Sequence, residues 1–248
     1  MRIALCLSGG LRNFKDTHYS FKNFILDKYN TDIFFYGLEN REGANKNKKD
    51  LLDLYNTKKY QINDTNFYQS IYCKYHPSSS FYGFYNVLKC NELKSQYENE
   101  NSFKYDIVIR SRTDYFWFRY LTDEELTLSK NNIIIPREWA FKCVNYFARF
   151  DGFAFGSSHL MDEYSQLFNR IEEYSRDIQF HPESLCGYHL MKNNIANIEN
   201  ERPVIFEYPS KRTEKYISPY KFIKYFKEED IEDEGEFLKL VSNKRKEF

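Results

Sequence analysis

The chain has 248 residues, of which 42% are hydrophobic and 29% charged, a composition that fits one large domain with a substantial core. Its 36 basic and 36 acidic residues cancel, which argues against general nucleic-acid binding, because that requires a basic surface. The five cysteines form no CxxC pair, which favours reduced thiols in a cytoplasmic protein over a disulfide framework or a zinc site. The apolar runs are too short for a transmembrane helix or a signal peptide, so we expect neither.

The first forty residues predict a strand, a helix and a second strand. Arg2–Leu7 is a short apolar run that ends at a glycine turn. Apolar residues at helical spacing follow between Phe21 and Tyr29, and Thr31–Gly37 forms the next apolar run. This order of elements is typical of a parallel sheet built from βαβ units.

The middle of the chain continues with alternating helices and strands. We expect a short helix at Leu51–Tyr55, a short strand at Lys58–Ile62 and a long helix from Phe81 to about Glu98. The long helix leads into a buried strand, and Ile133–Pro136 is a further short strand that proline stops.

The last third adds strands and two helices. Ala148–Gly156 alternates aromatic and small residues and is predicted as a strand. A helix capped by Ser157 or Ser158 should follow, with an uninterrupted apolar stripe. Proline at the first helical position and Glu in the first turn predict another helix at 182–192, and residues 203–208 predict a strand.

These elements predict one α/β domain over residues 1–210, with a mostly parallel, Rossmann-like sheet flanked by helices. A C-terminal helical extension, residues 211–248, should pack on it. Within the extension, Lys215–Lys227 mixes lysines with aromatic residues and can make weak peripheral contact with an anionic membrane surface. Four lysines anchor weakly, which favours a solvated connector packed by its aromatic residues.

The stretch Tyr105–Trp117 (YDIVIRSRTDYFW) begins as a buried strand and then becomes abruptly polar. Because side chains alternate along a strand, Arg110, Arg112 and Asp114 are predicted to line one face at its C-terminal end. Ligands bind at that end of strands in open α/β sheets; two guanidiniums suit a diphosphate, and the carboxylate suits a divalent metal or a sugar hydroxyl. The same pattern fits an Arg–Asp salt-bridge ladder without a ligand, and position alone does not decide between them.

The glycine turn after the first strand contains Ser8, Gly9 and Gly10, and Arg12 follows it. Backbone amides in such a turn can bind phosphate, although neither a P-loop lysine nor a GxGxxG pattern is present. The glycines alone favour a structural strand–helix turn, and Arg12 shifts the interpretation towards a nucleotide-binding loop.

Two further candidates lie in the second half of the chain. Asp151 precedes Gly152 and can present a carboxylate to a pocket, but Asp-Gly is also a common turn, and spacing favours the turn. His181 and Glu183 flank a predicted helix start, where a carboxylate can deprotonate or orient an acceptor hydroxyl. The same pair fits a helix cap with Glu placed favourably against the dipole, and spacing does not separate these interpretations.

Several segments resemble, in order and spacing, GT-A-type glycosyltransferases of a small group found in large DNA viruses and in bacterial surface-polysaccharide loci. The matching segments are IALCLSGGLRN, TDIFFYG, FYNVLKCNELKSQYE, YDIVIRSRTDYFW, IIIP, DGFAFGSSHLMDEYSQLF and HPESLCGYHL. They span roughly Met1 to Leu190, and their order, more than any single motif, carries the resemblance.

The resemblance implies a GT-A fold and transfer of a sugar from a nucleoside-diphosphate-sugar donor to a glycan or polysaccharide acceptor. It implies a cytoplasmic protein, in the host cytoplasm if viral. Ser8–Gly10 and Arg12 would face the nucleotide. Asp151, Glu183 and His181 would lie near the acceptor, where an inverting enzyme keeps its base.

GT-A enzymes hold a metal on the donor diphosphate with a DxD motif at the end of a central strand. The equivalent stretch here is Arg112-Thr113-Asp114, in which arginine replaces the first acidic residue. The resemblance implies that Arg110 and Arg112 bind the diphosphate and that Asp114 binds Mn²⁺ or Mg²⁺ or a donor hydroxyl, with Arg112 partly substituting for the cation. The alternative is a non-catalytic nucleotide- or glycan-binding module of the same fold, which the missing acidic residue favours.

Overall fold

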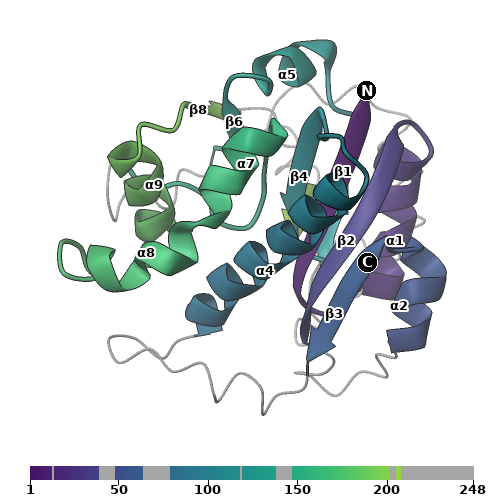
Figure 1. Cartoon of the computed structure of the whole chain (residues 1–248), viewed down its shortest axis with the longest axis horizontal. Coiled ribbons are helices and arrows are strands. Elements are labelled where there is room, and N and C mark those ends of the chain that lie inside the picture. Colours follow the sequence, from purple (N-terminus) through teal and green to yellow (C-terminus); the bar gives the residue numbers. More distant parts are fainter. Residues whose placement is uncertain are drawn as a thin grey trace, which may run out of the picture.

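A computed structural model describes residues 1–12, 14–38, 48–63, 79–117, 119–137, 147–200 and 205–207. In this part of the chain, a seven-stranded sheet is covered by helices on both faces (Figure 1). No helix among the described residues is long and apolar enough to cross a membrane. The predicted extension at 211–248 lies outside the described residues, as does its basic segment Lys215–Lys227.

The main sheet confirms the predicted mostly parallel α/β architecture. Its strands are β1 (Arg2–Gly10), β2 (Asn30–Leu38), β3 (Lys59–Asn63), β4 (Ile107–Ser111), β6 (Ile133–Pro136), β7 (Ala154–Gly156) and β8 (Asn197–Asn200). Their spatial order is β3-β2-β1-β4-β7-β6-β8. Of these strands, only β7 runs antiparallel to its neighbours, β4 and β6.

Helices divide between the two faces of the sheet (Figure 1). Alternation along β1 explains the two cores, because Leu5 and Leu7 pack towards one set of helices and Ala4 and Cys6 towards the other. The first set is α1 (Phe14–Phe21), continued by the π-helical turn Lys22–Leu26, and α2 (Lys48–Tyr55). The second set is α4 (Ser79–Glu100), α7 (Ser158–Ser165), α8 (Leu167–Tyr174) and α9 (Pro182–Lys192).

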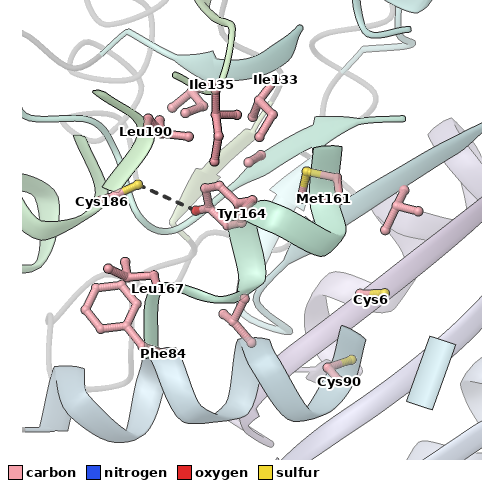
Figure 2. Packing of buried hydrophobic residues seen from close by; sticks show 14 of the residues in the cluster. Cys6, Phe84, Cys90, Ile133, Ile135, Met161, Tyr164, Leu167, Cys186 and Leu190 are labelled. Atoms are coloured by element: carbon pink, nitrogen blue, oxygen red, sulfur yellow. Dashed lines mark hydrogen bonds between the residues drawn. The ribbon is translucent and has the colours of Figure 1, made fainter. Parts of the chain in front are cut away.

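The core on the α4 side joins four helices, α4, α7, α8 and α9, to the sheet (Figure 2). Tyr164 of α7 lies at its centre, between Ile135 of β6 and Phe84 of α4. The Cys186 thiol of α9 donates to the Tyr164 hydroxyl at 3.8 Å. This packing seats α7 beside β4 and β7, and the Cys186–Tyr164 contact joins α9 to α7.

The polar stretch after β4 leaves the sheet earlier than predicted. β4 ends at Ser111, and a turn follows. Strand alternation therefore does not place Arg112 or Asp114, and the prediction that they continue the strand face is wrong. The cause is a competing hydrogen bond, because the Thr113 hydroxyl donates to the Gly10 carbonyl and draws the chain towards the end of β1.

Two elements of the second half also differ from the prediction. The strand expected over Ala148–Gly156 is confined to β7, because β7 alone of this stretch pairs with β4; Asp151 lies in a bend before it. The apolar stripe after Ser157 spans two helices, α7 and α8, which meet at Gln166. Ser157 is the N-cap residue, but its side chain makes no capping hydrogen bond.

A separate two-stranded antiparallel sheet pairs β5 (Tyr115–Trp117) with β9 (Ile205–Glu207). β9 lies within the strand expected at 203–208, whose other residues lie outside the described part of the chain. β5 is not apparent from the sequence pattern, because it is three residues long and its partner lies far along the chain. A short helix, α5 (Asp123–Leu128), follows β5 and begins with a capping box.

The strand order reverses direction between β1 and β4. From β1 the order runs through β2 to β3 on one side, whereas β4 pairs with the other side of β1. The carboxyl ends of these two strands, at Gly10 and Ser111, therefore flank the topological switch point. Ligands of open α/β sheets bind at this position.

Candidate functional site

Asp114 lies at the centre of an ion-paired cluster at the carboxyl ends of β1 and β4. Arg112 binds it in a bidentate manner, with Nε donating to Oδ1 (2.8 Å) and Nη2 to Oδ2 (2.6 Å). Arg12, from the turn after β1, donates from Nη1 to Oδ2 (2.7 Å). The Asp114 residue is 3% exposed, so a buried carboxylate joins two segments that are far apart in sequence.

Hydroxyl groups hold the turn that carries Asp114. Thr113 Oγ1 donates to the Gly10 carbonyl (2.7 Å), and Thr17 Oγ1 of α1 donates to the Thr113 carbonyl (2.5 Å). Both threonines are buried. The sequence pattern does not single out Thr17, and for Thr113 the one local signal is its place next to Asp114 after an apolar strand.

The two arginines keep Asp114 ionised. Burial alone would raise the pKa of Asp114, but the charge and hydrogen bonds of Arg112, followed by those of Arg12, hold its pKa below the usual value. The Arg112–Asp114 pair is thus the kind of ion pair that the salt-bridge interpretation of this stretch expected, and Arg12 is a further partner that it did not include.

Arg110 is not part of this ladder. It lies in β4 in register with Cys6 of β1, so its side chain faces the α4 side of the sheet, and it is 6% exposed. Within the described part of the chain, its Nε and Nη1 have no hydrogen-bond acceptor. A buried polar group without a partner costs about 1–3 kcal/mol, and an unpaired buried charge costs more. An anionic ligand would satisfy both groups.

Ser8 is a second buried donor on the same face. It lies two residues after Cys6 in β1, is 3% exposed, and its Oγ has no hydrogen-bond partner among the described residues. Gly9 follows with φ +113°, a conformation that glycine readily adopts and other residues rarely do. A Cβ on Gly37 would lie 1.7 Å from the Gly9 carbonyl oxygen, so the turn packs directly on β2.

Tyr115 connects the arginine cluster to the bend that contains Asp151 and Gly152. The Arg112 guanidinium lies over its ring, 4.8 Å from the centroid, and donates from Nη1 to its hydroxyl (3.3 Å). Gly152 packs against the same hydroxyl so closely that a Cβ would lie 1.8 Å from it. Burial raises the pKa of Tyr115, and the negative charge of Asp151, next to Gly152, contributes in the same direction.

Glu183 lies in the first turn of α9, which begins at Pro182 as predicted. The backbone N–H of Arg149 donates to the Glu183 carbonyl (2.9 Å), so the segment that leads to Asp151 runs beside the start of α9. Burial raises the pKa of Glu183, and the negative charge of Asp151 raises it further. His181 Nδ1 lies 3.2 Å from Glu183 Oε2. A carboxyl group with a raised pKa is suited to proton transfer.

The buried thiol of Cys186 is influenced by the charges of Arg110, Asp151 and Glu183. Burial raises its pKa to about 12; Asp151 and Glu183 act in the same direction and Arg110 in the opposite one. The contacts of Tyr115 with Arg112 and Gly152, and of Arg149 with Glu183, bring the end of β4, the Asp151 bend and the start of α9 together.

The donor set around Asp114 does not fit a divalent cation. Both carboxylate oxygens already accept hydrogen bonds from guanidinium groups. Mg²⁺ and Mn²⁺ prefer carboxylate, carbonyl and water oxygens, and guanidinium groups repel them. Among the described residues, no group of three or more His, Cys, Asp or Glu side chains is arranged to hold a metal.

Comparison with known proteins gives a family but no activity. No curated protein matches the chain. Residues 1–161 match the family model described as "Domain of unknown function (DUF7796)". The match includes Arg12, Arg110, Asp114 and Asp151, and it ends before Glu183. Because the match covers more than half of the 248 residues, the chain belongs to the DUF7796 family.

Proposed function

We propose that this protein is a GT-A-like glycosyltransferase that moves a sugar from a nucleoside-diphosphate-sugar donor to a glycan acceptor. The mostly parallel sheet with helices on both faces agrees with the fold that the sequence resemblance implies. Ser8, Arg12 and Arg110 lie at or next to the switch point of this sheet, where nucleotide ligands bind in open α/β folds.

One observation carries the proposal: the buried guanidinium of Arg110 has two N–H groups without an acceptor among the described residues. A diphosphate supplies anionic oxygens that match the planar fork of a guanidinium. Arg12 is the second candidate for this contact, since its side chain is 46% exposed even while it pairs with Asp114. Stabilising negative charge on the departing diphosphate would be the largest catalytic contribution.

This assignment changes the role expected of Arg112. Its Nε and Nη2 donate to Asp114, and its Nη1 donates to the Tyr115 hydroxyl. Arg112 therefore orders the turn after β4, and Arg110 takes the main role in binding the diphosphate.

In the proposed reaction, the carboxylates of Asp151 and Glu183 act on the acceptor hydroxyl. In an inverting transfer, Glu183 accepts the proton of the acceptor hydroxyl while the hydroxyl oxygen attacks the anomeric carbon and the diphosphate leaves. A raised pKa makes the Glu183 carboxylate a better base near neutral pH than an ordinary surface carboxylate. Asp151 and His181 orient and tune it.

The test is a panel of nucleoside-diphosphate sugars, assayed for hydrolysis and for transfer to glycan acceptors. Arg110→Gln should lower kcat/KM by about 100-fold or more, the scale of losing a donor aimed at developing charge. Arg170→Gln, on the exposed surface of α8, is the matched control and should leave turnover unchanged. Wild-type turnover in Arg110→Gln would contradict the proposal.

The second candidate is a non-catalytic nucleotide- or glycan-binding module. The observation that favours it is the engagement of Asp114 by two arginines where GT-A enzymes carry a metal-binding carboxylate. Nucleotide binding that depends on Arg110, with no turnover of any donor in the panel, would establish this module instead.

A further inference from the structure

We infer that the site binds a diphosphate through arginine side chains and the Ser8 hydroxyl, without a divalent cation, and that Asp114 is a positioning residue for Arg12 and Arg112. The inference deepens the proposed function and rests on it for the nature of the ligand. It follows from the contacts of Asp114, from the charge of the cluster and from two buried donors on one face of the sheet.

Asp114 holds two arginines rather than a cation. Three hydrogen bonds from two guanidiniums, at 2.6–2.8 Å, occupy most of the lone-pair positions that a carboxylate offers. A cation could reach Asp114 only by displacing Arg112 or Arg12, and the displaced guanidinium would then lie next to the cation. The carboxylate thus fixes two arginines at the ends of neighbouring strands.

The arginines give this end of the sheet an excess of positive charge. Arg12, Arg110 and Arg112 bring three positive charges to the carboxyl ends of β1 and β4, and Asp114 neutralises one of them. The two positive charges that remain equal the charge that a divalent cation supplies to a bound diphosphate in a metal-dependent enzyme. Because Arg110 is buried, its field is screened far less than that of a surface arginine.

Buried donors mark the place where a phosphoryl group would contact the protein. Arg110 Nε and Nη1 and Ser8 Oγ are buried donors without acceptors in the described part of the chain. Both residues face the α4 side of the sheet, from neighbouring parallel strands. A phosphoryl group that accepts hydrogen bonds from these donors would satisfy Arg110 and Ser8 together. We therefore assign these two residues to the buried part of the diphosphate site. Arg12, whose side chain is 46% exposed, lies at its solvent-exposed edge.

The experiment measures the affinity of the full chain for UDP, GDP and inorganic pyrophosphate by titration calorimetry. Each ligand is titrated in excess EDTA and again in excess Mg²⁺ or Mn²⁺. Because these anions chelate the metals themselves, the dissociation constants are calculated from the concentration of ligand that is not bound to metal. The inference predicts dissociation constants that agree within about twofold between the two conditions. Affinity that appears only with the cation would overturn it.

Variants separate a positioning residue from a metal ligand. Arg110→Gln should weaken binding at least about tenfold in EDTA, and Arg110→Lys should restore part of it, because it keeps the charge but loses the fork. Asp114→Asn should weaken binding by the same factor with and without the cation. A loss in Asp114→Asn that occurs only with Mn²⁺ would identify a metal ligand and refute the inference. If Asp114→Asn does not fold, the Arg110 pair and the EDTA comparison still decide the question.

The outcomes also separate this inference from the proposed transferase. Pyrophosphate or nucleotide binding in EDTA that depends on Arg110, with no turnover of any donor, supports the inference and refutes the transferase. Turnover that requires Mn²⁺ supports the transferase and refutes the inference. Absence of binding by all three ligands refutes both.

Discussion

The Tyr115 hydroxyl occupies the space in which a side chain at position 152 would begin: a Cβ built on Gly152 would lie 1.8 Å from that oxygen. Tyr115 is 1% exposed, so its ring has little room to withdraw. The same hydroxyl accepts a hydrogen bond from Arg112. The bend that carries Asp151 is therefore seated directly on the arginine cluster.

Gly152→Ala should displace either Tyr115 or the bend. We expect a loss of about 1–3 kcal/mol in the free energy of unfolding, typical of overpacking, measured by urea denaturation. Donor turnover should fall at least about tenfold, because small displacements of positioned groups have large effects on rate. Gly83→Ala is the control: Gly83 lies within α4 with no atom near its Cβ position, so alanine should stabilise the helix by roughly 0.5–1 kcal/mol. Equal effects of the two variants would contradict this account.

Asp114→Asn should destabilise the fold at neutral pH by about 3 kcal/mol, since it leaves two guanidiniums without their carboxylate. Because the folded pKa of Asp114 lies below 3.8, its stabilising contribution is complete above that pH and is lost as the pH falls through the folded pKa. The difference between wild type and variant should therefore be largest above about pH 4 and shrink in stronger acid. Urea denaturation at a series of pH values measures it, with Glu173→Gln in an exposed ion pair as the control of small effect.

A buried lysine of α4 hydrogen-bonds to side chains of α7 and lies outside the candidate site. Lys94 is 0% exposed, and its Nζ donates to Glu98 Oε2 (3.2 Å), Ser158 Oγ (2.7 Å) and Asp162 Oδ1 (2.7 Å). The Ser158 hydroxyl in turn donates to Glu98 Oε1 (2.6 Å). Every Lys94 ammonium proton thus has an acceptor, which is the condition under which a buried charge is tolerated.

Lys94→Met should remove about 3 kcal/mol of stability, because it leaves two carboxylates without their shared cation. Lys89→Met, on the same helix, removes the Lys89–Glu92 surface pair and a cation–π contact with Tyr85, and should cost about 1 kcal/mol or less. Thermal and urea unfolding compare the two. Neither residue belongs to the candidate site, so nucleotide affinity of the folded variants should match wild type. A cost for Lys94→Met as small as that for Lys89→Met would show that the network adds no stability.

Local signals in the sequence are enough for the elements that frame the site. The apolar run of β1 with its glycine turn, the long helix before β4, and the start of α9 at Pro182 are each specified by neighbouring residues. Parallel strands that alternate with helices then imply a sheet whose carboxyl ends carry the polar residues. The class of fold and the edge that bears the candidate residues follow from these patterns.

The arrangement within the site depends on contacts between distant residues and could not be predicted. The turn at Thr113 is held by Thr17 and Gly10, which lie 96 and 103 residues away. Strand alternation treats Arg110 and Arg112 alike, yet the first is buried without a described partner and the second is engaged by Asp114. That difference decides which arginine is available to a ligand, and it exists only in three dimensions.

Glu183→Gln should stabilise the protein at neutral pH while abolishing the proposed transfer. The folded pKa of Glu183 lies above the usual 4.5, because of burial and then the charge of Asp151, so the ionised carboxylate destabilises the fold once the pH exceeds the folded pKa. Glutamine removes that effect. The gain should be present at pH 7–8 and vanish as the pH falls below about 4.3, where the glutamate is protonated in both the folded and unfolded states.

The exposed Glu124, in the first turn of α5, is the matched control for Glu183. Glu124→Gln removes a carboxylate favourably placed at a helix N-terminus and should destabilise slightly, by about 0.3–1 kcal/mol. Opposite signs for the two variants are therefore expected in urea denaturation at pH 7. A gain in stability together with a loss of transfer is the pattern of a carboxylate kept for function, since functional sites often hold charged groups in environments that disfavour them. A destabilised Glu183→Gln at neutral pH would instead identify Glu183 as a structural helix-terminal residue.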